Sequence, residues 1–368
     1  MRVLHFVTGG FSGATQVAVD LCLAAQRSGD MQVLLVLRRK RNTDAARVQA
    51  LRDQGLDVRV VPGWSHMATV LALRKIALKW QPGILVAHGF SEHLWGRYAG
   101  LLAKVPKLVH VEHNSRERYT FWRLAQARWL AQRTAAIVGV SKGVRQSLLE
   151  HGFPPERCFA IFNGIEMRRF PASALIPWER REPGIVMAAR FARQKDHATL
   201  IQALPIMAQQ GLKPMLYLAG GGKRRLQRSM QALAHKLGVA DQVQFLGHVQ
   251  NLPAFLMQQQ VCVLSTHYEG LGLSLLEGMA AGCACIASDV VGVREVIDHE
   301  HTGLLVPEND ATALAAALQR ILTHPAEASA MAQAARQYAE TNFDVSIMQR
   351  HYAQLLHAVD ENRAFIPT

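Results

Sequence analysis

The stretch "RVLHFVTGGFSGATQVAVDLCLAA", residues 2–25, begins with an unbroken apolar run and passes through a glycine-rich loop into a helical pattern. A short apolar run bounded by glycines is typical of a buried β-strand. Glycines let the backbone approach a neighbouring group closely, and a helix N-terminus attracts anions. The stretch therefore predicts a strand–loop–helix unit, and its loop is either a tight turn or a ligand site.

Similar strand–helix units follow along the whole chain. Near-continuous apolar strands that alternate with helices are typical of a parallel sheet covered on both faces. The strand-like runs form two series: "RVLHFV", "QVLLVLR", "VRVVP", "ILVAH", "KLVHVEH", "AAIVGVS" and "CFAIFNG", and then "GIVMAARF", "PMLYLAGG", "QVQFLG", "VCVLST", "CACIASD" and "GLLVP". The sequence therefore predicts an α/β protein with two doubly wound, Rossmann-like parallel-sheet domains.

The expected domain boundaries follow from this pattern and from the length of 368 residues, which suggests about two domains. Pro171, Pro177 and Pro183 mark a linker candidate between the two series. We expect a first domain over 1–170, a linker over 171–183, a second domain over 184–342 and a helical tail over 343–368.

The composition favours a globular cytoplasmic protein. Hydrophobic residues make up 49% of the chain and charged residues 19%, which allows a substantial core. No apolar run reaches the roughly 18 residues of a membrane span, and the first apolar run is short for a signal peptide. The five cysteines are an odd number without metal-ligand spacing, so we expect reduced thiols.

The positive charge lies in the first half of the chain. Residues 1–170 hold 25 Lys and Arg against 11 Asp and Glu, a net charge of +14, whereas residues 171–368 have a net charge of −1. This asymmetry suggests that the first half meets an anionic partner such as a phosphorylated saccharide, an acidic lipid or a nucleic acid. A merely soluble basic surface is the alternative.

The run "EGLGLSLLEG" places Glu269 and Glu277 on either side of a glycine loop that leads into a short helix. Ser274 and Glu277 fit a capping box, which is one interpretation of Glu277. The other is an anion site, because residues 270–273 present bare backbone N–H groups at a helix start. Glu277 would then reach past the anion to neutral hydroxyls, such as those of a ribose.

The cations for such an anion stand in "RFARQK", where Arg190 and Lys195 follow the first strand of the second series. Ligands of parallel sheets bind at the carboxyl ends of the strands. Arg190, Lys195 and the loop 270–273 are therefore expected to converge on one diphosphate without a metal ion.

Other ligand-site patterns fit less well. "LAGGGKRR" lacks the glycine and the Ser or Thr that a Walker loop needs at Tyr217 and Arg224. "HVEHN" does not have the H-E-x-x-H zinc spacing, and there is no G-x-S-x-G element. The first glycine loop departs from the dinucleotide pattern, although the basic residues 38–41 after the second strand leave an NADP site as a weak alternative.

Together these motifs resemble the retaining glycosyltransferases of the GT-B fold, in particular glycosyltransferase family 4. The E-x7-E signature of that family is matched by Glu269 and Glu277, and its R-x4-K element by Arg190 and Lys195. Its N-terminal glycine loop is similar to "GGFSGA", and its N-G-[IV]-D element to residues 163–166. The last element departs at Glu166, to which we assign no direct role.

The resemblance implies two domains that face each other across a cleft, a C-terminal helix that returns to the first domain, and a nucleotide-diphosphate sugar as donor. It implies no cofactor and no metal. It also implies specific roles, by position: Arg190 and Lys195 hold the donor diphosphate with the backbone of Gly270, Gly272 and Leu273; Glu277 binds the ribose; Glu269 and His113 contact the donor sugar; Gly10 and Gly13 let the first domain close; and His248, in "LGHV", borders the nucleobase.

The acceptor is expected on the basic first domain. The segment "RERYTFWRLAQARWLAQR", residues 116–133, is either a helix that lies on an anionic membrane or one whose Trp residues enter the core. We expect a lipid-linked or phosphorylated saccharide acceptor, as in lipopolysaccharide or undecaprenyl-diphosphate glycan synthesis, and an enzyme that is peripheral at the inner face of the cytoplasmic membrane. Nucleic acid is not an expected partner. The alternatives are a non-catalytic nucleotide-sugar or nucleic-acid binding protein and an NADP-dependent oxidoreductase.

Overall fold

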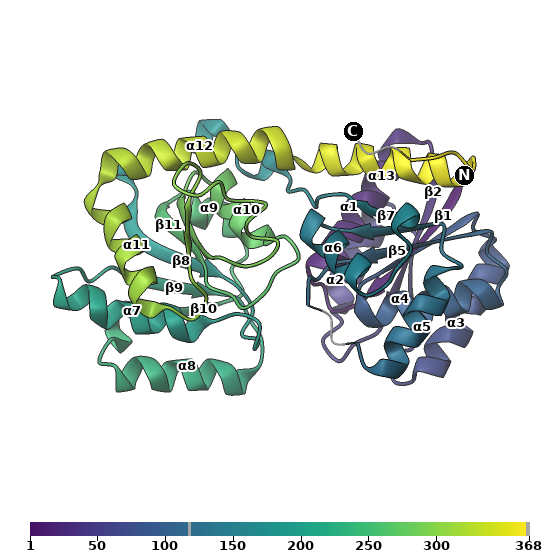
Figure 1. Ribbon diagram of the computed structural model, residues 1–368, viewed down its shortest axis with the longest axis horizontal. Coiled ribbons are helices and arrows are strands. Elements are labelled where there is room, and N and C mark those ends of the chain that lie inside the picture. The colour runs from purple at the N-terminus through teal and green to yellow at the C-terminus, as the bar shows by residue number, and fades with distance from the viewer. Residues whose placement is uncertain (117–118, 366–368) are drawn as a thin grey trace. The chain divides into compact units, whose positions relative to one another are not determined.

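The computed structural model describes residues 1–116 and 119–365, which fold into two α/β units (Figure 1). The first unit comprises Met1–Gly164 and Val345–Thr368, and the second comprises Ile165–Asp344. The segment 171–183, expected as a linker, lies within the second unit, where Trp178 is buried in the core. The last helix, α13 (Val345–Asp360), packs in the first unit, as predicted.

The first unit is built on a seven-stranded parallel sheet with the order β3-β2-β1-β4-β5-β6-β7. Each strand coincides with one of the seven predicted apolar runs. The strands are β1 (Arg2–Thr8), β2 (Gln32–Arg38), β3 (Val58–Val61), β4 (Ile84–His88), β5 (Lys107–Glu112), β6 (Ala136–Gly139) and β7 (Cys158–Ala160). Alternate residues of β1 enter cores on opposite faces, which is why the strands are apolar at most positions.

Helices cover both faces of this sheet. The helices are α1 (Gly13–Ser28), α2 (Ala45–Asp53), α3 (His66–Trp80), α4 (Phe90–Leu102), α5 (Phe121–Ala131) and α6 (Lys142–Glu150), with the short 3-10 helix η1 (Pro155–Arg157). Residues of α1 and α13 pack in one core cluster, and residues of α3 and α4 pack in another on the opposite face. Helix α4 contacts both α3 and α5.

The second unit is built on a six-stranded parallel sheet with the order β10-β9-β8-β11-β12-β13. The strands are β8 (Glu182–Ala188), β9 (Leu216–Ala219), β10 (Val243–Gly247), β11 (Gln259–Leu264), β12 (Ala284–Ser288) and β13 (Leu304–Val306). They coincide with the six runs of the second predicted series.

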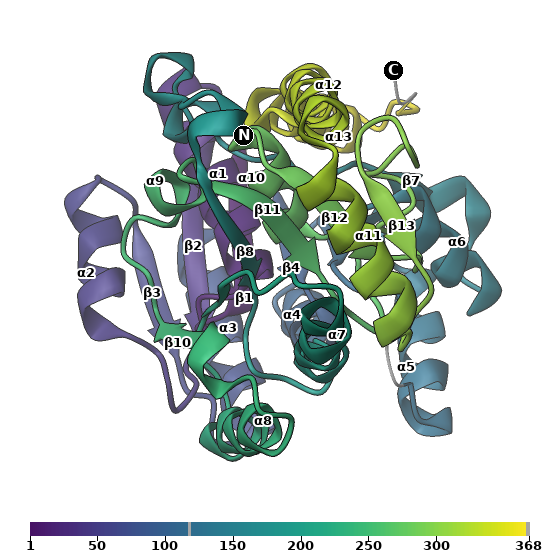
Figure 2. The ribbon, with the colours of Figure 1, turned by 90° about the vertical axis from the view of Figure 1, so that its left-hand side faces the viewer.

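The helices of the second unit are α7 (His197–Gln209), α8 (Arg224–Lys236), α9 (Leu252–Leu256), α10 (Leu273–Ala280), α11 (Ala311–Thr323) and α12 (Pro325–Phe343), with the 3-10 helices η2 (Met167–Arg169), η3 (Ala172–Ala174), η4 (Trp178–Arg180) and η5 (Ala240–Gln242). Residues of α7, α11 and α12 share one core with the strands (Figure 2). Helix α10 approaches β11 so closely that a Cβ on Gly278 would lie 2.4 Å from the sulfur of Cys262.

The strand order reverses once in each sheet, between β1 and β4 in the first and between β8 and β11 in the second. Ligands of doubly wound sheets bind at this switch point, outside the carboxyl ends of the strands. The loops after these four strands are therefore the places where functional residues are expected.

Two properties of the whole chain accompany the fold. Among the described residues, no helix combines the length and the apolar character that crossing a bilayer requires. The five cysteines are free thiols and all are buried.

Candidate functional site

Two loops of the second unit meet at its switch point. Residues 189–196 follow β8, and residues 265–272 follow β11. The backbone N–H of Asp196 donates to the carbonyl of Ser265 at 3.0 Å, and the N–H of His267 donates to the carbonyl of Gln194 at 2.9 Å. Because these bonds tie the loops together, the residues of the R-x4-K and E-x7-E elements lie on one connected edge of the sheet.

Lys195 and Glu269 form an ion pair across these loops, between Nζ and Oε1. The same carboxylate oxygen accepts a hydrogen bond from Oγ1 of Thr266 at 2.9 Å. The exposed fractions of the Lys195 and Glu269 side chains are 13% and 10%. Removing one partner of a nearly buried pair leaves the other charge uncompensated, so each group holds the other at the site.

Helix α10 begins directly after the glycine loop. Its N-cap is Gly272, which has a φ of +85°, and no side chain caps the helix. The predicted capping box is wrong, because the helix starts at Leu273 and Ser274 already lies inside its first turn. A left-handed glycine makes this turn without a side-chain cap.

The start of α10 is consequently open to a ligand. Among the described residues, none accepts a hydrogen bond from the backbone N–H groups of Leu273 and Ser274. Unpaired N–H groups and the helix dipole favour an anion at this position. The feature that the glycine loop predicted, a helix start that presents backbone to an anion, is therefore present.

Glu277 lies one turn further along α10 and pairs with Arg169, whose Nη1 is 3.4 Å from Oε1 of the carboxylate. Burial raises the pKa of Glu277, and the charge of Arg169 opposes this rise. Arg169 comes from η2 (Met167–Arg169), which follows residues 163–166. The sequence analysis gave Arg169 no role, since nothing in the sequence relates it to a residue 108 positions away.

Arg190 and His248 were also expected at the donor site. Arg190 follows β8 and is exposed, and no hydrogen bond or ion pair joins its guanidinium to another described residue. His248 follows β10 and is also exposed. The structure thus joins Lys195 to Glu269 and Glu277 to Arg169, and it leaves Arg190 and His248 exposed.

In the first unit, the glycine loop after β1 differs from the expectation in one position. Gly9, a loop glycine to which the resemblance assigned no role, is the residue that permits close approach: a Cβ there would lie 2.7 Å from the carbonyl oxygen of Arg38. A Cβ on Gly10 would make only ordinary contacts, the nearest at 3.6 Å. Gly13 is the exposed first residue of α1.

His113 ends a chain of three imidazoles in the first unit. Nδ1 of His5 lies 3.0 Å from Nε2 of His88, and Nδ1 of His88 lies 3.3 Å from Nε2 of His113. Burial lowers the pKa of His5 to about 4 and that of His113 to about 3, and it holds the pKa of His88 well below the ordinary value. The three rings are therefore neutral at pH 7, and each has one N–H and one lone pair to share.

A second buried group contains His93, His110 and Glu112, whose possible ligand atoms all lie within 4.8 Å of one another. Both ring nitrogens of His93 are already engaged, by Arg97 at 2.6 Å and by the hydroxyl of Tyr119 at 3.0 Å. The buried guanidinium of Arg97 would also repel a cation, so we assign no metal ion to this group.

The comparison with known families agrees with the geometry of both units. The model of "Glycosyltransferase Family 4" matches residues 11–169, and the model of "Glycosyl transferases group 1" matches residues 175–338. The first begins within the glycine loop of the first unit, and the second covers Lys195 and the paired carboxylates of the second unit. The chain belongs to glycosyltransferase family 4.

Individual relatives are similar to this family 4 enzyme over most of its length. It is 29% identical to glycogen synthase of Mycobacterium tuberculosis over 310 residues. This aligned region covers 80% of this chain and 73% of the relative. It is 26% identical over 264 residues to the 2-deoxystreptamine glucosyltransferase of Streptomyces kanamyceticus, over 69% of this chain and 67% of that protein.

Solved structures share the fold. Anabaena Alr3699/HepE in complex with UDP and glucose superposes with a TM-score of 0.85 at 20% identity, covering 97% of this chain and 100% of that one. The lipopolysaccharide outer core galactosyltransferase WaaB superposes with a TM-score of 0.72 at 16% identity, covering 97% and 99%.

Family 4 membership settles the class of protein. The fold is GT-B, the enzyme is a hexosyltransferase that uses a nucleotide sugar, and members of the family retain the anomeric configuration. The NADP-dependent oxidoreductase and the non-catalytic binding protein, which the sequence had left open, are thereby set aside.

Proposed function

We propose that this enzyme transfers a hexosyl group from a nucleotide-diphosphate sugar, bound at the switch point of the second unit, to a lipid-linked or phosphorylated saccharide. One observation supports the donor site above all others. Two carboxylates, each paired with a cation, flank a helix start whose first N–H groups have no partner among the described residues. This arrangement suits a ligand with a diphosphate in the middle and hydroxyls at both ends.

The donor diphosphate would bind at the start of α10. The backbone of Gly270, Gly272 and Leu273 would donate to its oxygens, while Arg190 and Lys195 supply positive charge without a metal ion. Lys195 is held by Glu269, so binding of the donor would exchange part of this ion pair for a contact between ammonium and phosphate. The Glu269 carboxylate would then accept hydrogen bonds from the hydroxyls of the donor sugar.

The two ends of the donor would be held separately. Glu277, a partly buried carboxylate that pairs with Arg169, would accept hydrogen bonds from the ribose hydroxyls. His248 would border the nucleobase. From the first domain, the neutral imidazole of His113 would hydrogen-bond to the donor sugar, and the loop that contains Gly10 and Gly13 would face the donor in the closed complex.

The chemistry requires stabilisation of the leaving group. The bond between the anomeric carbon and the diphosphate oxygen breaks, and its electron pair stays with the diphosphate. The acceptor hydroxyl oxygen bonds to the same face of that carbon, and its proton passes to the departing phosphate oxygen. Preorganised N–H groups and cations at the developing charge contribute about 3 kcal/mol each to such steps.

A uridine nucleotide is the first donor to test. The HepE structures hold UDP, UDP with glucose, and UDP-glucose, in a protein that shares this fold over 97% of the chain. At 20% identity the likeness concerns the fold, so GDP- and ADP-sugars belong in the same test.

The acceptor domain carries an exposed apolar and basic face. On α5, Phe121, Trp122 and Trp129 are 79%, 74% and 46% exposed, so the alternative in which the Trp residues enter the core is wrong. Further exposed apolar side chains lie on or next to α3 and α4: Trp64, Met67, Leu71, Leu78 and Leu102. Glu117 and Arg118 of the predicted basic segment lie outside the described residues.

This face has the chemistry of a peripheral membrane surface. Between positions 64 and 133, the only acidic residues that the structure describes are Glu92 and Glu112, and both are buried. Aromatic and basic side chains together favour the interface of an anionic bilayer. We therefore infer a cytoplasmic enzyme that binds the inner face of the membrane and glycosylates a lipid-linked glycan, for which lipopolysaccharide synthesis is one candidate pathway.

The proposed function is tested by measuring nucleoside diphosphate release from UDP-, GDP- and ADP-sugars with and without candidate acceptors. We expect release by the wild type that depends on a lipid-linked or phosphorylated saccharide, and a large loss in Lys195→Met. Release that no acceptor increases, or release that persists in Lys195→Met, would contradict the proposal.

A further inference from the structure

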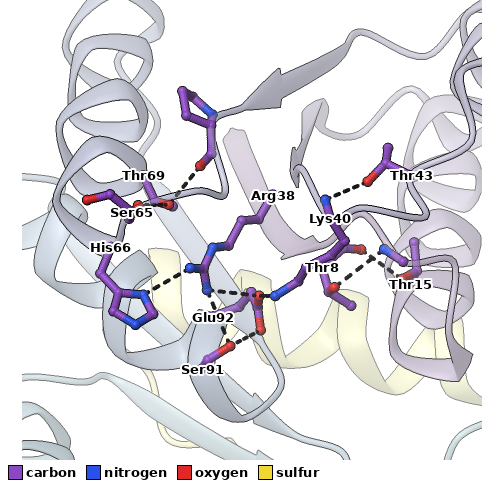
Figure 3. Close-up of polar contacts among 12 residues, drawn as sticks. Thr8, Thr15, Arg38, Lys40, Thr43, Ser65, His66, Thr69, Ser91 and Glu92 are labelled. Atoms are coloured by element: carbon purple, nitrogen blue, oxygen red, sulfur yellow. Dashed lines mark hydrogen bonds and ion pairs between the residues drawn. The ribbon is translucent and has the colours of Figure 1, made fainter.

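A polar cluster lies at the carboxyl edge of the first sheet, beside the β1–β4 switch point, and none of the donor-site roles uses it (Figure 3). We define the Arg38 cluster as Arg38, Lys40, His66, Ser91 and Glu92. Arg38 is the last residue of β2, His66 is the first of α3, and Ser91 and Glu92 lie in the first turn of α4. Three elements that are distant in sequence thus contribute to one site.

Arg38 is the centre of the cluster and is only 4% exposed. Its Nη1 donates to Oε1 of Glu92 and to Oγ of Ser91, each at 3.4 Å. Its Nη2 lies 2.9 Å from Nδ1 of His66, while its Nε has no hydrogen-bond partner among the described residues. The buried guanidinium is therefore compensated by one long ion pair, and its buried Nε–H has no acceptor among the described residues.

The charge of the cluster is not balanced. Nζ of Lys40 lies 2.8 Å from the same oxygen of Glu92 that Arg38 contacts, so two cations share one carboxylate. The other oxygen of Glu92, Oε2, accepts a hydrogen bond from the hydroxyl of Ser91, with 2.7 Å between the two oxygens. Because the single carboxylate of Glu92 faces the two cations of Arg38 and Lys40, the cluster has a net positive charge. The exposed Arg39 and Arg41 add to this charge.

His66 adds a neutral donor. Burial and the neighbouring charges of Arg38, Arg123 and Lys40 lower its pKa. Because Nδ1 accepts from Arg38, the ring proton of the neutral form is on Nε2. The ring is fixed by stacking on Trp95, with 4.3 Å between the ring centroids.

The cluster also lies where a ligand of this sheet is expected. The loop after β1 is held against the end of β2, because the N–H of Gly9 donates to the carbonyl of Arg38 at 2.8 Å. Helix α4 starts on the other side of the switch point, and no side chain caps its N-cap, Gly89. The side chain of Lys40 is 34% exposed and can reach a ligand in solvent.

From this combination we propose that the Arg38 cluster binds a phosphoryl group of the acceptor. A phosphate would pair with the cations of Arg38 and Lys40 and accept a hydrogen bond from the Nε2–H group of His66. The inference rests on the proposed function for calling the ligand the acceptor, and it makes a phosphate-free saccharide a poor substrate. The phosphoryl group can belong to a soluble sugar phosphate or to a polyprenyl-linked glycan, since both offer the same oxygens.

The test measures binding of a phosphate probe to protein saturated with UDP, so that the donor site is occupied. Glucose 6-phosphate and inorganic phosphate are titrated calorimetrically, with glucose as the uncharged comparison. We expect both phosphates to bind and glucose not to bind, and we expect Lys40→Met to weaken phosphate binding about tenfold while its UDP affinity stays unchanged. Lys236→Met, an exposed lysine on α8, is the matched control and keeps wild-type values.

Lys40→Met keeps the buried Arg38–Glu92 pair, so its folding is less at risk than that of Arg38→Gln. A flotation experiment with phosphatidylcholine vesicles, with and without undecaprenyl phosphate, tests whether the phosphoryl group is lipid-linked. If the wild type binds the vesicles that contain undecaprenyl phosphate more strongly than Lys40→Met does, the ligand is a lipid-linked phosphate. Equal phosphate binding by wild type and Lys40→Met, or none by UDP-saturated wild type, would overturn the inference. Absence of UDP binding would instead contradict the donor site; phosphate binding by wild type and Lys40→Met would then be compared without UDP.

Discussion

The ammonium of Lys195 lies against the carboxylate of Glu269 across 74 residues of sequence, with Thr266 hydrogen-bonded to the same oxygen. The two residues come from the two motifs that the family resemblance assigns to different parts of the donor. Their contact means that the diphosphate and the donor sugar are expected on adjacent sides of one ion pair. Substitutions of its two members should therefore have different effects.

Lys195→Met should lower kcat by about 100-fold or more, because it removes a charge that acts on the leaving group. Glu269→Gln should leave UDP affinity near that of the wild type and lower kcat/KM for the nucleotide sugar, since it affects contacts with the sugar. Steady-state kinetics with UDP inhibition separates the two effects. Equal loss of UDP affinity in both variants would show that the pair is only structural.

The contact of Arg169 with Glu277 predicts a pH effect on donor binding. Burial raises the pKa of Glu277, and Arg169 opposes the rise, so Arg169→Met should raise this pKa further. The protonated carboxyl is a poorer acceptor for ribose hydroxyls than the carboxylate. As the pH falls from neutral, nucleotide-sugar affinity should therefore decline earlier in Arg169→Met than in the wild type, as measured by calorimetry. Parallel pH profiles would contradict the assignment of Glu277.

Four fully buried histidines, His5, His88, His93 and His110, predict that the first unit loses stability in acid. Burial lowers the pKa of each in the folded state, to about 4 for His5, from the ordinary 6.5 that applies after unfolding. Between these values the unfolded chain binds more protons. The stability is thus complete above pH 6.5 and is lost as the pH falls toward 4, by up to about 1.4 kcal/mol per pH unit for each histidine.

Denaturant unfolding of wild type and His110→Phe across this range checks the prediction. Neither ring nitrogen of His110 makes a hydrogen bond to a described residue, although Nε2 lies 3.5 Å from Oε2 of Glu112, and Phe keeps most of the stacking on His93. In His110→Phe, the slope of the unfolding free energy against pH should correspond to one proton fewer than in the wild type. His301→Gln, a substitution at an exposed histidine, should leave this slope unchanged. An unchanged slope in His110→Phe would show that His110 does not contribute.

The exposed rings on α5 predict membrane binding. Trp122→Ser and Phe121→Ser should each reduce co-sedimentation with vesicles that contain phosphatidylglycerol, and high salt should reduce it further by screening the basic residues. Ile176→Ser replaces an exposed apolar residue of the second unit and should have no effect. If both α5 variants sediment like the wild type, this face does not bind the bilayer.

Most of the fold follows from patterns that are local in sequence. Strands buried on both faces are apolar at most positions, so each of the thirteen runs was visible, and the turn chemistry marked their ends. The capping box failed because Ser274 has the right residue type for a cap, whereas Gly272 provides the turn through a left-handed φ that no sequence pattern displays.

The site was predictable only in part, since pairing depends on contacts between distant segments. The motifs identified Lys195 and Glu269 but not their ion pair, and they gave no indication of Arg169. The Arg38 cluster appeared in the sequence only as a basic run, because Glu92 and His66 reach it from other elements. The Trp residues of α5 fitted either a core or a surface helix, and only the packed structure distinguishes these.

The central claim is that the start of α10, between Glu269 and Glu277, binds a nucleotide-diphosphate sugar. A thermal-shift panel with UDP-, GDP- and ADP-sugars on wild type and Glu277→Ala tests it most directly, because a ligand that binds only the folded state raises the melting temperature. The account predicts that at least one nucleotide sugar stabilises the wild type and that the shift is largely lost in Glu277→Ala. No stabilisation of the wild type by any of them, or equal stabilisation of the variant, would contradict it.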